Sequence, residues 1–477
     1  MKVLRSRRLA GLAACAALVF GVAGTAGAVP AQAQARATAT VLQSQVVASW
    51  GNNGSGELGD GTRTDRSRYG DIGALDSVVR VAAGWTPRYG HTLAVRSDGT
   101  VWAWGDNTHG DLGDGTTDGR LAPVQVTGLT GATQVAGGCD HSLALRSDGT
   151  VWAWGGNGAG QLGRGTVTGY EVAPAPVSGL AGVTKISAGC GFSLALRSDG
   201  TVWAWGYDSV GQLGNGSTAD SAVPVKITGV SQVTAIAAGW DSAVAIVAGG
   251  ASVWAWGGND SGQLGDGTLA GRATPVRVTQ IGTVHIAGAA VGLKFAAILG
   301  TDGSVWAWGA DRYGQLGNAP AFGPATRPVN TIGAGSGITQ ISAGSWHVLA
   351  LKSDGTVLAW GDNTVGELGI GTTTSVTGPV QVTGLTGATQ VAAGTAAGFA
   401  VHVVPLIAVP DLTGDTQARA SQALQAAGLV LGAVTQVTDK YCAHLGVMSQ
   451  NPTAGTSVFP GSAVSVTIGQ APPNGCP

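Results

Sequence analysis

The chain contains a repeated segment, and histidine holds the same position in three copies of it, at His91, His141 and His347. Each of these histidines follows a glycine-containing turn. A ring of imidazoles could hold a metal ion, because neutral imidazole is a common metal ligand. Phe192 and Ser242 hold the equivalent position in two other copies of the same repeated segment, so a ring of histidines would be incomplete. The sequence therefore favours structural histidines that bond a neighbouring strand, and we expect no metal site.

Two glycine-rich stretches, Gly54 to Gly59 and Gly158 to Gly163, match the G-x-G-x-x-G spacing of a dinucleotide-binding loop. That loop functions where a strand meets a helix in a βαβ unit, and neither stretch opens a helix. The sequence also lacks the HExxH and G-x-S-x-G motifs of hydrolases, and its GDGT loops lack the acidic spacing of a calcium loop. We therefore expect a protein that is not an enzyme and holds no cofactor.

Three of the 15 tryptophans stand apart from the rest, and they mark the predicted binding site. Trp85, Trp240 and Trp346 lie in turns, where large aromatic side chains on a rigid scaffold are typical of a recognition surface. The alternative is that these three tryptophans bind no partner and only cap, by packing, the mouth of a channel through the centre of the fold. The polar and aromatic neighbours that complete the predicted partner-binding set are Arg88, Tyr89, Asp140 and Asp241.

Short apolar strands joined by Asp-Gly pairs must position these turns. Residues 141–155 contain two apolar strands around Asp148 and Gly149, and Asp-Gly tolerates the positive φ angles of a two-residue hairpin turn. Because both strands are almost continuously apolar, we expect both of their faces to be covered. The same turn recurs at Asp98-Gly99, Asp199-Gly200, Asp302-Gly303 and Asp354-Gly355, and Gly249-Gly250 replaces it in a sixth copy.

A Trp-Gly pair recurs about every 50 residues, a period that indicates repeated supersecondary units. Its tryptophans are Trp50, Trp104, Trp154, Trp205, Trp256, Trp308 and Trp360. Within one period we read strands at 101–105, 123–126, 132–136 and 142–145. Four strands per unit in seven units predict an all-β, seven-bladed propeller of four-stranded blades.

The two ends of the repeat region are complementary. The strand at 46–51 has no hairpin partner, and the last repeat ends with a strand at 398–404 whose own partner never follows. Pairing of these N- and C-terminal strands would close the ring and leave neither edge unpaired. We therefore assign residues 36–404 to one closed propeller.

The stretches VWAWGDNTHGDLGDGT (101–116), VWAWGGNGAGQLGRGT (151–166) and VWAWGGNDSGQLGDGT (253–268) resemble repeats of the regulator of chromosome condensation family. The resemblance extends over about 45–404 and implies a seven-bladed propeller whose chain ends share a blade.

Two functional alternatives come with that resemblance. Secreted β-lactamase-inhibitor propellers of this superfamily bind through aromatic turns on one face, although Cys139, Cys190 and Thr395 occupy some of these turns here. Guanine-nucleotide exchange, the activity of the family's namesake, fits poorly with an exported protein. The near-uniform repeat spacing also leaves no room for a large inserted wedge.

Residues 405–470 follow a different pattern, typical of a small α+β module. Asp415 is the predicted N-cap of a helix and Gly428 its C-cap. Ala420, Ala423, Leu424 and Ala427 share one helical face, and strands are predicted at 429–438, 446–450 and 463–468.

VPDLTG (409–414), ALQAAGLVLG (423–432) and QNPTAGTSVFPGSAVSVTI (450–468) resemble a PASTA domain, the module of penicillin-binding proteins and bacterial Ser/Thr kinases. This resemblance implies binding to peptidoglycan, with a spacer role as the alternative. Residues 471–477 form a short tail.

The first 35 residues read as a secretory signal peptide, with four basic residues before an apolar run at 9–23 and small-residue sites ending at Ala28 or Ala35. No other apolar stretch is long enough to span a bilayer. Four of the 25 Lys and Arg lie in this leader, which leaves 21 against 27 Asp and Glu and a net charge of about −6. An acidic exported chain is a poor candidate for binding nucleic acid.

Four cysteines remain after the leader, and an exported chain with an even number of cysteines invites disulfides. Three connectivities are possible. Cys139 and Cys190 hold equivalent places in adjacent repeats, and Cys442 and Cys476 both lie near the C-terminus, so we predict these two pairs.

Together these features predict a secreted, non-enzymatic binding protein, a monomer, either free or associated with the cell wall. Its propeller would recognise a cell-envelope or extracellular protein, or a glycan, and its C-terminal module would attach it to peptidoglycan.

Overall fold

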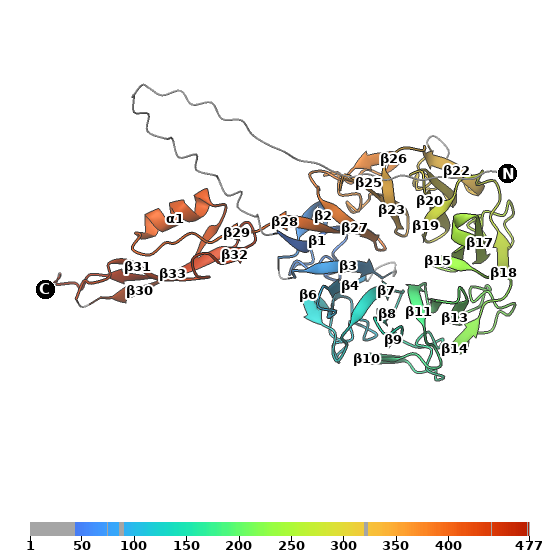
Figure 1. Cartoon of the computed structure of the whole chain (residues 1–477), viewed down its shortest axis with the longest axis horizontal. Coiled ribbons are helices and arrows are strands. Elements are labelled where there is room, and N and C mark those ends of the chain that lie inside the picture. Colours follow the sequence, from blue (N-terminus) through green and yellow to red (C-terminus); the bar gives the residue numbers. More distant parts are fainter. Residues whose placement is uncertain are drawn as a thin grey trace, which may run out of the picture. The chain divides into compact units, whose positions relative to one another are not determined.

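In the computed structural model, residues 43–73, 75–84, 90–318, 323–439, 441–474 and 476 are described. The predicted signal peptide, residues 1–35, lies outside them. Strands dominate the described residues, and residues 43–405 form four-stranded antiparallel sheets arranged around a central axis (Figure 1). A small α+β domain follows from residue 407.

Seven four-stranded sheets are present among the described residues, and in six of them the strands follow chain order from the axis outward. These six are β3 (Val78–Ala83), β4 (His91–Arg96), β5 (Val101–Gly105) and β6 (Arg120–Gln125); β7 (Ala132–Gly137), β8 (His141–Arg146), β9 (Val151–Gly156) and β10 (Tyr170–Pro176); β11 (Val183–Ala188), β12 (Phe192–Arg197), β13 (Val202–Gly206) and β14 (Ser221–Lys226); β15 (Val233–Ala238), β16 (Ser242–Val247), β17 (Ser252–Gly257) and β18 (Arg272–Arg277); β19 (Ile286–Val291), β20 (Phe295–Gly300), β21 (Val305–Gly309) and β22 (Ala325–Ile332); and β23 (Ile338–Ala343), β24 (His347–Lys352), β25 (Val357–Gly361) and β26 (Val376–Gln381).

The seventh sheet joins the two ends of the repeat region, in the order β2 (Arg66–Asp71), β1 (Gln43–Gly51), β28 (Ala397–Pro405) and β27 (Ala388–Ala393). Strands β1 and β28 pair antiparallel along their full length, from Gln43 opposite Pro405 to Gly51 opposite Ala397. Trp50 lies opposite Gly398, where a Cβ atom would come within 2.3 Å of the indole. The two strands that the sequence left without partners therefore pair with each other.

The hairpin tips differ from the predicted two-residue turn. Between β4 and β5 the connection comprises Ser97, Asp98 and Gly99, and of these only Gly99 has a positive φ, +78°. Asp98 Oδ1 instead accepts hydrogen bonds from the backbone N–H and the hydroxyl of Thr100. This is the three-residue connection with glycine in the left-handed position, and the aspartate stabilises it by bonding its own turn. In the sixth copy, a single 3-10 turn (η1, Ala248–Gly250) takes its place.

The cores lie between neighbouring sheets, and the Trp-Gly tryptophans fasten one sheet to the next. Trp154, for example, is fully buried, and its Nε1 donates to the backbone oxygen of Asp111 in the preceding sheet at 2.8 Å. All seven members of the series make this bond: Trp50, Trp104, Trp154, Trp205, Trp256, Trp308 and Trp360, at 2.7 to 3.0 Å. The accepting oxygens belong to the long glycine-rich loops, so this bond fixes those loops as well.

Six of the seven outermost strands carry proline near their centres, as Pro123 does in β6 and Pro224 in β14, and β2 is the exception. Proline is tolerated there because one edge of an outer strand needs no backbone donor. Strand β6 extends from Arg120 to Gln125, whereas the sequence placed a strand at 123–126, because its pairing with β5 continues past an irregularity to Arg120 opposite Gly105. The other proline-bearing outer strands are β10, β18, β22 and β26.

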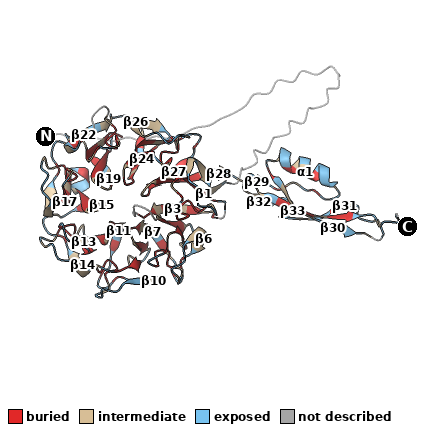
Figure 2. Cartoon of the chain, turned by 180° about the vertical axis from the view of Figure 1, so that it is seen from behind, coloured by how far each residue is buried: buried red, intermediate tan, exposed pale blue. Residues whose placement is uncertain are grey.

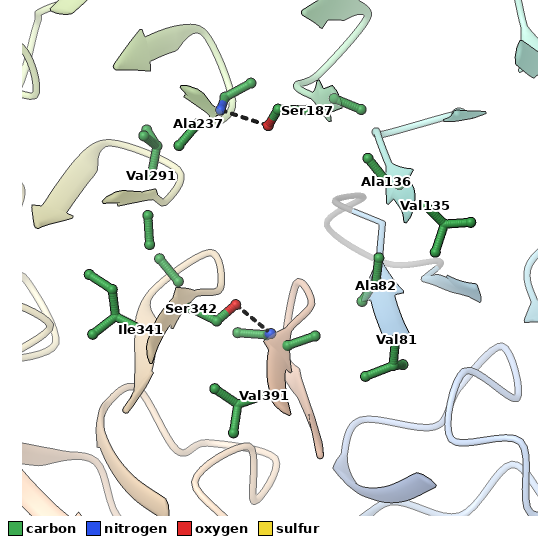
Figure 3. Close-up of a pocket in the computed structure, with 18 of the residues that line it drawn as sticks. Val81, Ala82, Val135, Ala136, Ser187, Ala237, Val291, Ile341, Ser342 and Val391 are labelled. Carbon is green, nitrogen blue, oxygen red and sulfur yellow. Dashed lines mark hydrogen bonds between the residues drawn. The ribbon is translucent and has the colours of Figure 1, made fainter. Parts of the chain in front are cut away.

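The seven inner strands line a narrow channel of about 260 Å³ with small apolar side chains, and polar ones bridge them (Figure 3). Gln390 reaches the next inner strand, where its Oε1 accepts from Val81 N and its Nε2 donates to Val81 O, at 2.7 and 2.8 Å. The Oγ atoms of Ser187 and Ser342 accept backbone N–H bonds from the following sheets at 3.0 and 2.9 Å. The channel wall is therefore hydrogen-bonded from sheet to sheet.

The C-terminal domain contains β29 (Ile407–Ala408), α1 (Gln417–Ala426), β30 (Val430–Thr438), β31 (Gly446–Asn451), β32 (Ser457–Val458) and β33 (Ala463–Gln470). The three predicted strands are present, with β33 between β30 and β31. Helix α1 buries Ala420 and Leu424 against the sheet and exposes its other side (Figure 2). The domain has a core of its own, formed within residues 407–468.

One end of α1 differs from its prediction. The N-cap is Thr416, not Asp415, because Thr416 Oγ1 accepts from Arg419 N at 3.3 Å while the backbone of Asp415 bonds Leu412 and Val447. Gly428 follows the helix with a φ of +77°, as a C-cap requires. No helix among the described residues is long and apolar enough to cross a lipid bilayer.

Both predicted disulfides are present. Cys139 is bonded to Cys190, and Cys442 to Cys476. The first joins adjacent sheets, and the second ties the turn after β30 to the C-terminal tail.

The close approach of the glycine-rich loops to the indoles leads to a stability prediction. A Cβ atom on Gly113, whose φ is +65°, would lie 2.8 Å from Trp154 Nε1, whereas a Cβ on Gly115, with φ +86°, would meet nothing within 4 Å. Both substitutions to alanine strain the backbone by about 1 kcal/mol. Gly113→Ala should cost about 1–3 kcal/mol more because the indole must move.

Chemical denaturation of both variants would measure this difference. Equal losses of unfolding free energy in Gly113→Ala and Gly115→Ala would mean that the indole contact does not constrain the loop.

Candidate binding surface at the channel mouth

Six described turns surround one mouth of the channel, and we call them the turn face: residues 138–140, 189–191, 239–241, 292–294, 344–346 and 394–396. Each connects an innermost strand to the next strand of its sheet. The backbones of successive turns are hydrogen-bonded, as in Cys190 N to Trp240 O at 3.2 Å and Trp240 N to Gly292 O at 3.4 Å. Ser345 N likewise donates to Thr395 O at 3.2 Å. The turns thus form a rigid platform.

Four of the seven predicted partner-binding residues lie on this face, namely Asp140, Trp240, Asp241 and Trp346. Trp85, Arg88 and Tyr89 lie outside the described residues. Trp240 and Trp346 are both half-buried, so part of each indole is open to solvent. They do not form one cluster, since Trp346 packs against Tyr313, with ring centroids 5.7 Å apart, whereas Trp240 lines a separate hollow.

The hollow beside Trp240 has a volume of about 680 Å³ and lies among three consecutive turns and two glycine-rich loops. Asp140, Trp240, Asp241 and the Cys139–Cys190 disulfide line it from the turns. The loops contribute Gly158, Ala159, Gln161, Tyr207, Ser209, Val210 and Gln212. Tyr207 and Val210 are 43% and 40% exposed, so both offer apolar surface to solvent. The sequence reasoning missed both, because only the neighbouring turns give them a common wall.

A glycine explains why the hollow is open. In two repeats a glutamine of the loop donates to a carboxylate on the turn: Gln161 Nε2 to Asp140 Oδ1 at 3.1 Å, and Gln263 Nε2 to Asp241 Oδ1 at 3.4 Å. In the repeat between them, the turn position holds Gly191. Gln212 therefore lacks the equivalent carboxylate, and the space that an aspartate would fill stays empty.

Asp140 and Asp241, the two carboxylates at the rim of the hollow, differ in the groups that partner them. Lys294 Nζ lies 2.7 Å from Asp241 Oδ2 and 2.9 Å from Asp260 Oδ2, so Asp241 is already paired with a cation. Burial alone would raise the pKa of Asp140, but the His141 ring and the Gln161 amide outweigh burial and hold that pKa below its usual value. Asp140 is therefore ionised at neutral pH.

The predicted structural role of the histidines is confirmed for two of them. His91 Nε2 lies 3.0 Å from Ser142 Oγ of the next sheet, and His141 Nε2 lies 2.9 Å from Ser193 Oγ. Ser142 Oγ also donates to Asp111 O, so it accepts from His91. Burial, and then the neighbouring His141, lower the pKa of His91 to about 4, and the ring stays neutral.

Buried carboxyl groups form a second feature of this end of the propeller. The oxygens of Glu57 and Glu367 accept from backbone N–H groups two residues earlier, at 2.7 and 2.9 Å. Burial raises the pKa of each to about 7. Four other repeats hold glutamine at this position, namely Gln161, Gln212, Gln263 and Gln315, with the same bond at 2.9 to 3.0 Å. A glutamic acid whose pKa is raised thus takes the place of an amide.

Comparison with known families finds two kinds of match. The regulator of chromosome condensation (RCC1) repeat matches residues 98–145, 148–196, 199–246, 251–299, 302–351 and 354–401. The PASTA domain matches residues 407–470.

Individual relatives and solved structures agree with the repeat match. The ultraviolet-B receptor UVR8 of Arabidopsis thaliana is 29% identical over 340 residues, which are 69% of this chain and 76% of the receptor. The human E3 ubiquitin-protein ligase HERC2 is 29% identical over 301 residues, 62% of this chain but only 5% of the ligase. Human WBSCR16 superposes with a TM-score of 0.67 and 25% identity, over 75% of this chain and 98% of its own. Yeast RCC1 (Prp20), solved with Kap60, gives 0.67 and 23%, over 76% and 90%.

The raised pKa of Glu57 predicts a pH-dependent effect of Glu57→Gln. Because the folded state binds this proton more tightly than the unfolded state, the free energy that the protonated group contributes is present below pH about 4.5 and is lost as pH rises through 7. The glutamine variant should therefore be more stable than the parent at pH 8, on the order of 1–3 kcal/mol, with little difference at pH 4.5.

Denaturation midpoints at the two pH values would measure the effect. The reverse exchange, Gln315→Glu, is the matched control and should lose stability at pH 8. An equal effect of Glu57→Gln at both pH values would contradict the raised pKa.

Proposed function

This chain belongs to the RCC1-repeat family and carries a C-terminal PASTA domain, and from that premise we propose that it is an exported, non-enzymatic binding protein. In this proposal the propeller is a closed ring of seven blades whose turn face binds a protein of the cell envelope or the extracellular space. The PASTA domain attaches the ring to peptidoglycan.

The turn face is the observation that carries the proposal. Backbone hydrogen bonds hold its turns in one arrangement, so binding there costs little ordering of the chain. Its half-exposed aromatic side chains, Trp240 and Trp346, join Tyr207 on one surface, and aromatic residues in rigid surroundings dominate the energy of protein interfaces.

Closure of the ring is supported by two independent sets of contacts. Nine residues of β1 pair with nine residues of β28. Trp50, at the first end of the region, donates to the backbone oxygen of Glu367 in the sheet before the last, as the other six tryptophans do in their own sheets. A ring with no free blade edge at its ends suits a protein exposed outside the cell.

Export is supported by the two disulfides, since such bonds persist in oxidising compartments. They agree with the signal peptide predicted from the sequence. The named activities of the relatives differ, one being a receptor and another a ubiquitin ligase. A repeat shared between such different proteins favours binding over a common reaction.

The peptidoglycan attachment predicts a sedimentation result. The full mature chain should sediment with purified, insoluble peptidoglycan, and the chain ending at Val404 should stay in solution. The truncated propeller should remain folded, because the cores of its sheets lie within residues 47–401 and the core of the C-terminal domain lies apart. Sedimentation of both forms would overturn the role of the PASTA domain.

The binding face predicts a capture result. Immobilised mature protein should retain a protein from the solubilised envelope of the producing cell, and the double variant Trp240→Ala, Trp346→Ala should reduce retention at least tenfold. Trp203→Ala is the matched control, because this tryptophan bonds Thr201 near the opposite ends of the strands. Unchanged retention by the double variant would exclude the turn face.

A further inference from the structure

The hollow beside Trp240 combines an open apolar wall with a carboxylate, Asp140, that forms no ion pair with a described lysine or arginine. Tyr207, Val210 and Trp240 supply the wall, and the Cys139–Cys190 disulfide adds to it. Asp241 at the rim is neutralised by Lys294. Within the part of the chain that the structure describes, no lysine or arginine pairs with Asp140, whose nearest partner in an ion pair is His141 at 3.7 Å.

We propose that this hollow binds an arginine side chain that projects from the protein partner, with its guanidinium at Asp140 and its stem against Trp240 and Tyr207. The inference rests on the proposed function, because it assigns a chemistry to the partner of the turn face.

Arginine fits these walls better than the other side chains that carry a positive charge. Its planar guanidinium stacks on aromatic rings and bonds a carboxylate through two N–H groups, whereas a lysine ammonium is a point charge that keeps its water. The chain already uses this contact elsewhere: Arg146 lies over the ring of Trp152 at 5.6 Å, and Arg197 over the ring of Trp203 at 5.9 Å. A bond between an arginine and an ionised carboxylate is also stronger than one between neutral groups.

The hollow has room for the backbone of the partner as well. Gln212 Oε1 accepts from Val210 N at 3.0 Å, while its Nε2 has no carboxylate to meet because Gly191 replaces it. This amide therefore offers a donor for a carbonyl oxygen of the loop that bears the arginine. A volume of about 680 Å³ is larger than one side chain and lies in the range of ligand-binding clefts.

The charge around the hollow favours the approach of a basic loop. Asp362 adjoins the turn face, because its backbone N–H donates to Trp346 O. Asp106 and Asp140 both act on the ring of His91, so Asp106 belongs to the same end of the propeller. The positive charges among the described residues near this mouth are Lys294, which is already paired with Asp241, and Arg312, which lies over the ring of Tyr313. Acidic groups on one face accelerate the encounter with a basic partner.

Small probes can test this pocket on the intact mature chain. The first probe is Nα-benzoyl-L-arginine amide, and the second is the corresponding citrulline amide, which has the same shape without the charge. In a ligand-observed NMR titration we expect the arginine probe to bind at least tenfold more tightly than the citrulline probe. The lysine analogue should bind more weakly than the arginine probe.

Variants locate the binding. Asp140→Asn should abolish the preference for arginine over citrulline, and Trp240→Ala should weaken both probes. Asp148→Asn is the matched control, since it removes a carboxylate at the opposite end of the same strand, β8. Gly191→Asp should fill the hollow and prevent binding, and a thermal melt would verify that this variant folds despite the φ of +76° at this position.

Three results would overturn the proposal: no binding of the arginine probe, equal binding of the two probes, or an arginine preference that survives Asp140→Asn. If capture of the envelope protein depends on Trp240 and Trp346 while the probes fail, the arginine pocket is wrong and the binding face remains. If the probes succeed and the capture fails, the pocket exists, and the proposed partner is wrong.

Discussion

The bond from each Trp-Gly indole to a backbone oxygen of the preceding sheet is the interaction on which the rest of the structure depends. It is repeated seven times, always from a buried tryptophan, and it connects parts of the chain some 43 to 47 positions apart within the ring. The bond from Trp50 spans 317 positions. Because the indole needs the loop to pass within van der Waals distance, the loop must carry glycine where Gly113 stands. One side chain therefore determines the spacing of the sheets and the path of the loops.

The loops fixed in this way position the candidate site. Gln161 and Gln212 accept backbone bonds within their own loops, and their carbonyl oxygens receive the indole bonds of Trp205 and Trp256. Their amide nitrogens then face the turns. The turn residue near each glutamine decides whether a hollow forms. Asp140 occupies that position beside Gln161, whereas Gly191 leaves it empty beside Gln212. The candidate site in this chain thus comes from small departures between repeats whose frameworks are the same.

Much of the architecture could be predicted from the sequence, because apolar strands at a period near 50 residues have few alternative arrangements. The pairing of the strands that contain Trp50 and Phe399 followed from the two unpaired ends, and the disulfide at Cys139 followed from equivalent repeat positions. The turn at Asp98 was mispredicted because an Asp-Gly pair fits both a two-residue and a three-residue connection. The N-cap at Thr416 was mispredicted because Asp415 and Thr416 are adjacent and either side chain could cap the helix. Tyr207 and Val210 were missed because the wall they form exists only between repeats. The buried Glu57 could have been found by aligning it with Gln161 and Gln315.

The prolines of the outermost strands restrict how other molecules can approach. A polypeptide that adds to a sheet needs an uninterrupted row of backbone donors, and Pro123, Pro224 and Pro275 interrupt that row on the rim. Strand addition is therefore disfavoured at the six sheets whose outermost strand carries proline, whereas β2 (Arg66–Asp71), the outermost strand of the seventh sheet, carries none. A partner that binds by adding a strand is thereby excluded from most of the outer sheet edges, and the ends of the sheets are left as the wider surfaces for association.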